Sequence, residues 1–238
     1  MIKPTWDENE KTIGVLGLAP YASLDFYKKV LDATSAQKDW HHARLILDSN
    51  PKIPSRGRYF DLGEENPAPY IYQAIMDLLN NGADFVCIPC NTAHYFYEEF
   101  AKNLKDKVPN IIEITNQYIR LSYPKIKTIG LLASKATVQY KLYGKFSSGN
   151  RFNILTPKSD QYKVGELIER IKQGDTGPST IKSIKGLADS LQSKGAECIV
   201  LGCTELSMIL TDGDLSIPVI DSNAVYAKYA IDRAQNKI

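Results

Sequence analysis

Two cysteine residues, each following an apolar segment, are the side chains of this sequence best suited to acid–base chemistry. Cys90 follows residues 82–89 and Cys203 follows residues 195–202, and both segments open with glycine, alanine and an acidic residue. Each segment is short enough for a buried strand, and a helix-like pattern follows each cysteine. We therefore expect both thiols at the carboxyl ends of strands beside a helix N-terminus, whose N–H groups and dipole lower a thiol pKa. The two copies suggest one active site with a thiol on either side.

The elements that position these cysteines occur twice in the chain. The phrase at residues 11–18 predicts a strand, and a similar phrase returns at residues 127–134. The two cysteine segments are separated by nearly the same distance and follow in the same order. Chance similarity of apolar strands is the alternative, but the shared order and spacing favour an internal duplication. A repeat this long indicates a doubled domain and not a solenoid.

Strand and helix patterns alternate between these markers. Further strands are predicted at residues 43–48, 111–114, 152–155 and 219–221, and helices at 24–31, 69–80, 93–104, 165–172, 180–193 and the C-terminus. Alternating units of this kind predict an α/β fold whose parallel sheets carry helices on both faces. We expect a first domain of residues 1–118 with 215–238 and a second of residues 119–214. Ligands of such sheets bind at the carboxyl ends of the strands.

The composition excludes several classes of partner. With 43% hydrophobic residues, 24% charged residues and a net charge of +2, the chain lacks the basic face that nucleic acid requires. No apolar run approaches the roughly 20 residues of a membrane helix. Acidic residues in the first ten positions oppose a signal peptide, and the four cysteines are expected to be reduced, so a cytoplasmic protein is predicted. The histidines show no zinc spacing with the cysteines, and no dinucleotide phrase follows the first strand, so neither a metal nor a nucleotide cofactor is expected.

The loop at residues 49–56 reads Ser-Asn-Pro-Lys-Ile-Pro-Ser-Arg and follows a predicted strand. Its two prolines make it stiff, which suits a loop that holds a side chain in place. The planar guanidinium of Arg56 could bind a carboxylate through two hydrogen bonds. A solvated surface charge is the alternative interpretation of this arginine.

Three phrases together resemble the cofactor-independent aspartate/glutamate racemase superfamily, and its aspartate racemase branch in particular. They are the loop at 49–56, Pro-Cys-Asn-Thr-Ala-His at 89–94 and Gly-Cys-Thr-Glu at 202–205, and the resemblance runs from about Lys11 to the last helix. It implies two pseudo-symmetric, doubly wound α/β domains with the active site in the cleft between them. It also implies racemisation of aspartate without any cofactor. One of Cys90 and Cys203 would remove the α-proton as a thiolate, and the other would return a proton from the opposite face.

The resemblance also implies roles for residues around the two thiols. Arg56 and Lys172 would bind the distal carboxylate of a small acidic amino acid, although Lys172 alone is an ordinary cation near a helix end. Backbone N–H groups at the helix starts Asn91-Thr92 and Thr204-Glu205 would bind the α-carboxylate. Ser23 keeps the hydroxyl of a threonine that is usual in the family.

Two residues beside the cysteines have both a functional and a structural interpretation. His94 could orient the Cys90 thiol, or it caps or packs. Glu205 could tune Cys203, although a glutamate in a first helical turn is favoured by the dipole alone.

Departures from the family pattern leave alternatives open. The first turn, residues 17–20, is one residue shorter than usual, while the absence of the glutamate branch's Asp-Ser-Gly phrase favours aspartate. Another acidic substrate such as glutamate, or a non-catalytic dicarboxylate-binding protein, remains possible. Cys87 and Cys90 also form a Cys-Ile-Pro-Cys phrase found in redox proteins, but Cys87 and Cys198 lie within apolar strands and are expected to be buried. The family implies a homodimer, and aromatic residues 95–97 are expected in the core or at the subunit interface.

Overall fold

The chain folds into two compact units. The structure, a computed structural model, describes residues 9–147, 149 and 152–238, so most of the acidic start discussed above lies outside the described residues. Unit 1 takes its described residues from Met1–Pro89, Phe96–Pro109 and Tyr226–Ile238. Unit 2 takes them from Cys90–Tyr95 and Asn110–Val225.

Unit 1 contains a parallel sheet of three strands in the order β2-β1-β3. The strands are β1 (Ile13–Gly17), β2 (Leu45–Ser49) and β3 (Phe85–Cys87). All residues of the central strand β1 are buried, as its continuous apolar run predicts, whereas β2 lies at an edge and is partly exposed. Ile13 lies opposite Leu45 on one side and Phe85 on the other, which fixes the register.

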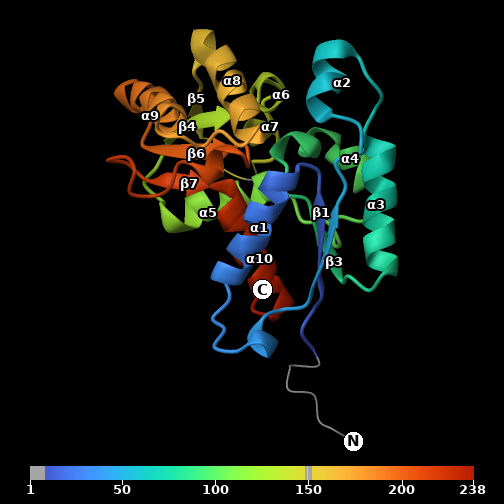
Figure 1. The fold of residues 1–238 in the computed structure, drawn as a ribbon. Coiled ribbons are helices and arrows are strands. Elements are labelled where there is room, and N and C mark those ends of the chain that lie inside the picture. The colour runs from blue at the N-terminus through green and yellow to red at the C-terminus, as the bar shows by residue number, and fades with distance from the viewer. Residues whose placement is uncertain (1–8, 148, 150–151) are drawn as a thin grey trace, which may run out of the picture. The chain divides into compact units, whose positions relative to one another are not determined.

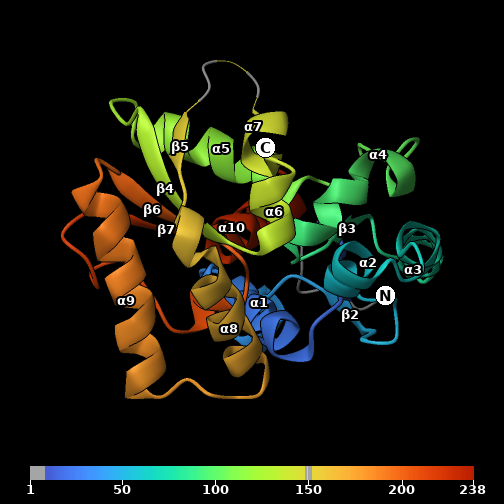
Figure 2. The ribbon, with the colours of Figure 1, turned by 90° about the horizontal axis from the view of Figure 1, so that it is seen from above.

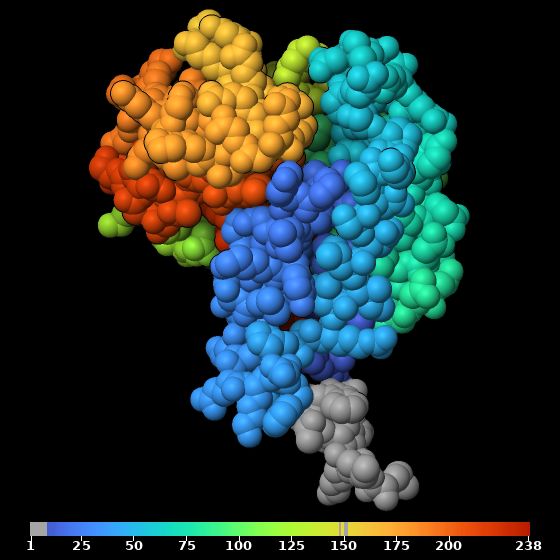
Figure 3. Space-filling model, viewed as in Figure 1, coloured from blue at the N-terminus to red at the C-terminus, as the bar shows by residue number. Residues whose placement is uncertain are grey.

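Helices cover both faces of this sheet. Figures 1 and 2 show α1 (Pro20–Asp32) and α3 (Ala68–Asn80) on opposite faces. The other helices with residues in this unit are α2 (Arg56–Leu62), α4 (Tyr97–Phe100) and α10 (Ser222–Ala234), of which α10 begins in unit 2. The segment between α1 and β2 contains a short 3-10 helix, Asp39–His41, and lies on the surface (Figure 3).

Unit 2 contains a parallel sheet of four strands in the order β5-β4-β6-β7. The strands are β4 (Thr128–Ala133), β5 (Asn153–Leu155), β6 (Cys198–Gly202) and β7 (Val219–Asp221). The helices are α5 (Ile111–Ser122), α6 (Lys135–Gln139), α7 (Leu142–Lys145), α8 (Gln161–Lys172) and α9 (Pro178–Ser193), and a 3-10 helix spans Lys158–Asp160. Figure 2 shows α9 and α5 on opposite sides of the sheet. Since β7 pairs with β6, residues 219–221 belong to the second sheet, whereas the predicted boundaries assigned residues 215–238 to the first domain.

The two sheets repeat one design, which agrees with the predicted duplication. The order β2-β1-β3 corresponds to β5-β4-β6, and the same glycine–alanine approach occurs in both. A Cβ atom on Gly14 would lie 2.9 Å from the Cβ of Ala83, and one on Gly130 would lie 3.0 Å from the Cβ of Ala196. Contacts this short leave room only for glycine in the central strand. The predicted fold class, two α/β domains with parallel sheets, is confirmed.

Two predicted elements are wrong. Residues 111–114 are not a strand but the first turn of α5, because the Asn110 side chain accepts hydrogen bonds from the N–H groups of Ile112 and Glu113 at 2.9 and 3.3 Å. Residues 93–104 are not one helix but the end of a 3-10 helix, Asn91–Phe96, followed by α4 and turns. The Cys90 carbonyl accepts from the Ala93 N–H and from the His94 ring, which favours the tighter 3-10 turn over an α-helix.

Candidate functional site

The two predicted catalytic cysteines lie in loops after strands, and each is followed by a 3-10 helix in place of an α-helix. β3 ends at Cys87, and Pro89, which lacks an N–H group, precedes the half-buried Cys90. Cys203 directly follows β6, and the chain then turns into a 3-10 helix, Leu206–Met208. The 3-10 helix Asn91–Phe96 begins directly after Cys90, where a helix start was predicted, whereas the helix after Cys203 does not begin until Leu206. Both cysteines belong to unit 2.

A buried polar network fixes the turn that carries Cys90. The Asn91 amide nitrogen donates to the Ser222 hydroxyl at 3.1 Å, and the Tyr143 hydroxyl donates to the Asn91 amide oxygen at 3.0 Å. Ser222 in turn donates to the carbonyl of Leu201 in β6 at 2.7 Å. All three side chains are buried. The network therefore ties the Cys90 turn to the strand that leads into Cys203.

Cys203 is buried and is surrounded by charge. Its Sγ atom donates a hydrogen bond to Glu205 Oε2 at 2.9 Å. Burial raises the pKa of the Cys203 thiol well above its usual range, and the charges of Glu205 and Cys90 raise this pKa further. Lys172 acts in the opposite direction and lowers it. The low pKa expected from the sequence is thus wrong for Cys203, because burial and a carboxylate replace the expected helix dipole.

Lys172 is the last residue of α8 and lies within electrostatic range of Cys203. Its ammonium group forms an ion pair with Glu169 at 2.7 Å. Burial lowers the pKa of Lys172, but the hydrogen bond with Glu169 and the charges of Glu205 and Cys203 raise it by more. Lys172 therefore stays protonated beside the second thiol.

A cluster of three hydroxyl groups, which the sequence patterns did not indicate, adjoins the Cys90 turn. The hydroxyls of Thr92 and Ser134 lie 2.8 Å apart, and Ser134 donates to Thr137 at 3.0 Å. Ser134 follows β4 and caps α6 by accepting from the Thr137 N–H. The duplication could have identified Ser134 as a candidate site residue. Ser134 ends the second copy of the first strand phrase and so corresponds to the turn after β1.

Arg56 is the first residue of α2 and lies beside the turn after β1 in unit 1. Its guanidinium donates to the carbonyls of Leu18 and Pro54 at 3.1 and 3.2 Å, while its buried Nε atom has no hydrogen-bond partner among the described residues. Ser23 lies at the same turn and donates to the Ala19 carbonyl at 2.6 Å. The stiff loop thus brings Arg56 to the turn whose length differs from the family pattern.

His94 and the remaining cysteines have mainly structural surroundings. The fully buried His94 ring contacts the Cys90 carbonyl at 3.0 Å, and because a carbonyl can only accept, Nδ1 carries the hydrogen. Cys87 and Cys198 are fully buried, as predicted, and burial raises the pKa of each thiol to about 12. A thiol held neutral in this way is a poor nucleophile, which disfavours the redox interpretation of Cys87.

The structure thus divides the predicted site residues between the units. Unit 2 holds Cys90, Asn91, Thr92, His94, Lys172, Cys203, Thr204 and Glu205, and unit 1 holds Ser23 and Arg56. Thr204 is buried and its hydroxyl donates to Glu205 Oε2 at 3.5 Å. The catalytic and binding roles of these residues remain predictions.

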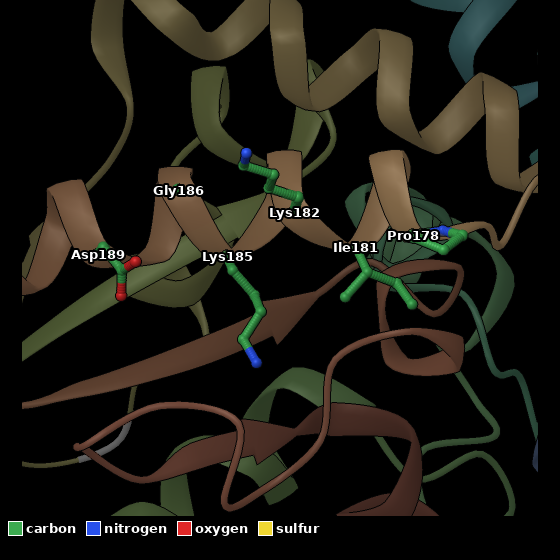
Figure 4. A pocket seen from close by; sticks show the side chains of 6 residues that line it. All are labelled: Pro178, Ile181, Lys182, Lys185, Gly186 and Asp189. Carbon is green, nitrogen blue, oxygen red and sulfur yellow. The ribbon is translucent and has the colours of Figure 1, made fainter.

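The described residues outside the cysteine loops were also searched for pockets, metal sites and membrane-spanning helices. A shallow hollow along α9 is lined by Pro178, Ile181, Lys182, Lys185, Gly186 and Asp189, none of which is a predicted site residue (Figure 4). Within residues 9–147, 149 and 152–238, no group of three histidine, cysteine or acidic side chains is arranged to hold a metal ion. No helix in this part of the chain is long and apolar enough to cross a membrane.

Comparisons with known proteins agree with the fold. The Asp/Glu/Hydantoin racemase family matches residues 15–230. The broad specificity amino-acid racemase RacX of Bacillus subtilis (strain 168) is 31% identical over 227 residues, which cover 92% of this chain and 96% of RacX. The structure of the Picrophilus torridus aspartate racemase is 30% identical, with a TM-score of 0.85 and 94% of each chain covered.

A more distant structure shares the fold. The glutamate racemase of Aquifex pyrophilus is 17% identical with a TM-score of 0.57, and the match covers 95% of this chain and 84% of that one. The family match, in contrast, extends over most of the sequence and includes both cysteine phrases. The chain therefore belongs to the Asp/Glu/Hydantoin racemase family.

Proposed function

We propose that this protein racemises aspartate without a cofactor, using Cys90 and Cys203 as its two proton-transfer groups. The observation that carries the proposal is the buried network from Asn91 through Ser222 to the Leu201 carbonyl, which joins the Cys90 turn to the strand that leads into Cys203. The two cysteines come from the two repeat copies and lie in one unit. Family membership adds that the reaction is of the racemase type. A homodimer and a cytoplasmic location remain predictions from the sequence.

In the proposed reaction a proton leaves one face of the α-carbon and another arrives on the opposite face. One sulfur, as thiolate, takes the α-hydrogen as a proton, and the electrons of the broken C–H bond stay on the substrate. The other sulfur, as thiol, then gives its proton to the carbanion. Hydrogen-bond donors must stabilise this carbanion. The backbone N–H groups of Asn91-Thr92 and Thr204-Glu205 are our candidates for the α-carboxylate.

The substrate class rests on the two cations among the predicted site residues. Arg56 has a buried Nε donor without a partner among the described residues, and its guanidinium is held in place by two carbonyls. Lys172 remains charged near Cys203. We infer that these groups bind the distal carboxylate of aspartate, as the similarity to the Picrophilus aspartate racemase also favours. Broad specificity is the second candidate, because RacX is similar over nearly its whole length.

Isotope exchange tests the reaction and its substrate together. The enzyme is incubated without cofactor in deuterated water with L-aspartate, L-glutamate or L-alanine, and α-deuterium and chirality are followed by NMR and chiral chromatography. We expect inversion and α-deuteration of aspartate to be the fastest. Comparable rates with alanine would favour broad specificity instead. A rise in melting temperature with aspartate, without exchange, would favour the non-catalytic binding protein.

Arg56→Lys tests the proposed carboxylate contact. Loss of a bidentate, charge-assisted contact costs about 1.5–3 kcal/mol, so kcat/KM for aspartate should fall roughly 10- to 100-fold. Arg58→Lys is the matched control, because Arg58 lies on the same helix but pairs with Glu64 at the surface. An Arg56→Lys enzyme as active on aspartate as the control would exclude Arg56 from substrate binding.

A further inference from the structure

Cys203 and Glu205 form a buried pair whose geometry gives the two thiols different environments. Cys203 is 7% exposed and Glu205 is 5% exposed. After β6 the chain turns so that the Leu206 N–H donates to the Cys203 carbonyl at 3.1 Å, and this turn accommodates the 2.9 Å contact between Sγ and Oε2. Thr204 donates to the same carboxylate oxygen at 3.5 Å. Because a carboxylate can only accept, the Cys203 thiol is the donor in this contact and carries the shared proton.

Ionisation of Cys203 would place a thiolate against a carboxylate in a buried site, where like charges repel strongly. The other groups that act on Cys203 are Cys90, whose charge adds to the repulsion, and Lys172 at the end of α8, whose charge opposes it. Tyr143, from α7, also interacts with this site, because burial raises the pKa of its hydroxyl and the charge of Cys203 raises it further. Glu205 is the group in direct hydrogen-bond contact with the sulfur.

We propose that Glu205 is a positioning residue that holds Cys203 as the proton donor of the resting enzyme and leaves Cys90 to act as the base. This inference rests on the two-cysteine reaction proposed above. The resting enzyme then accepts the enantiomer whose α-hydrogen faces Cys90. The Cys90 thiolate takes that proton, and the Cys203 S–H bond breaks to protonate the opposite face, leaving its electron pair on sulfur. Proton exchange with water afterwards restores the Cys203 thiol and the Cys90 thiolate.

Alkylation of the intact enzyme tests this assignment residue by residue. Wild-type protein and Glu205→Gln are treated with iodoacetamide between pH 6 and 10, and Cys203 modification is measured by peptide mass spectrometry. The pH at half-maximal rate reports thiolate formation independently of how accessible the sulfur is. We expect the Cys203 rate at pH 8 to rise about tenfold or more in Glu205→Gln, because removing the repulsion favours the thiolate. Glu166→Gln, which removes an exposed carboxylate of α8, should leave the Cys203 profile unchanged.

Two further measurements distinguish an effect of the Glu205 charge on Cys203 from a general disturbance of the structure. Glu205→Asp keeps the charge, so its Cys203 midpoint should stay above that of Glu205→Gln. The KM values of the two aspartate enantiomers should differ in the wild type, because one of them binds the less populated form of the enzyme, in which Cys203 is the thiolate and Cys90 the thiol. In Glu205→Gln the ratio of the two KM values should move towards one. If Glu205→Gln does not fold, the pH profile of Cys203 alkylation in the wild type still tests the assignment.

Two results of the alkylation experiment would contradict the assignment of Cys203 as the resting proton donor. A wild-type Cys203 that titrates like a free thiol, near pH 8.5, overturns the assignment. So does a midpoint that is the same in wild type and Glu205→Gln. Either result in an enzyme that racemises aspartate would leave the proposed function intact, whereas absence of racemisation would overturn both.

Discussion

At the scale of single residues, the side chain of Asn91 links the two cysteine-bearing loops of unit 2. The sequence indicated that Asn91 offers a backbone N–H group to the substrate. In the structure its side chain is occupied by Ser222 and Tyr143, both buried, and Ser222 continues to the Leu201 carbonyl. The side chain therefore positions the Cys90 turn, and only the backbone of Asn91 is left for the role that the sequence predicted.

Removal of the Tyr143 hydroxyl tests this network. Tyr143→Phe leaves the Asn91 amide oxygen without its donor, so we expect the free energy of unfolding to fall by about 1–3 kcal/mol in urea denaturation. Racemisation should also slow, because the Cys90 turn is held less firmly. Tyr162→Phe, at an exposed position of α8, should change stability by less than about 0.5 kcal/mol. Equal effects of the two substitutions would contradict a structural role for the network.

The surroundings of Cys203 could not be predicted from the sequence. The sequence identified both thiols because each follows a strand phrase in a duplicated chain. It could not reveal that Glu205 would fold back onto Cys203, because the intervening turn replaces the α-helix that the pattern indicated. Thr92, Ser134 and Thr137 come together from two separate loops, and contacts of this kind cannot be read from local spacing.

At the scale of elements, the long periodic segments were predicted well and the short ones were not. α3 and α9 match their predicted helices to within a few residues, since each has a regular buried stripe along its length. Residues 111–114 were predicted as a strand because four residues are too few to distinguish a strand from a helical turn. The phrase Asn110-Ile-Ile-Glu113 carried a helix-start signal, an N-cap residue followed by glutamate at the third helical position.

The Asn110 cap provides a test of this element. Asn110→Ala removes the acceptor for two backbone N–H groups, so the free energy of unfolding should fall by about 0.5–2 kcal/mol. Asn110→Ser keeps a capping oxygen and should lose less. Chemical denaturation of both variants measures the difference. A serine variant that is as unstable as the alanine variant would mean that packing, and not capping, explains the importance of this position.

At the scale of the whole molecule, the duplication made the fold predictable. Two sheets with corresponding strand orders, each with a glycine of the central strand against an alanine, follow from one repeated phrase. The domain boundaries were harder to predict, because the contacts divide the chain within the Cys90 loop and within α10. Such crossings depend on contacts between distant residues, which a strand or helix pattern does not contain.

Each unit also buries a neutral cysteine outside the proposed catalytic pair, and this predicts how stability depends on pH. Burial raises the pKa of Cys87 in unit 1 and of Cys198 in unit 2 to about 12, whereas an unfolded thiol titrates near pH 8.5. The native state therefore holds more protons than the unfolded state above about pH 8.5, so stability must fall as pH rises. Each thiol contributes up to about 1.4 kcal/mol per pH unit in this range.

Urea denaturation between pH 7 and 10 measures this dependence. The Cys198→Ala variant lacks one of these buried thiols, so its free energy of unfolding should fall less steeply with pH than that of the wild type. Identical slopes for the variant and the wild type above pH 8.5 would show that Cys198 is not held neutral in the native state.

The central claim, that two sulfurs share the proton transfer, is tested most directly by replacing each cysteine separately. Aspartate inversion is measured in deuterated water for Cys90→Ser and Cys203→Ser, with Cys198→Ala on β6 as the control. We predict that each serine variant loses inversion by about 10²–10⁴-fold, the usual contribution of a general acid or base, while the control keeps it. Inversion at the wild-type rate in either serine variant would contradict the two-cysteine mechanism.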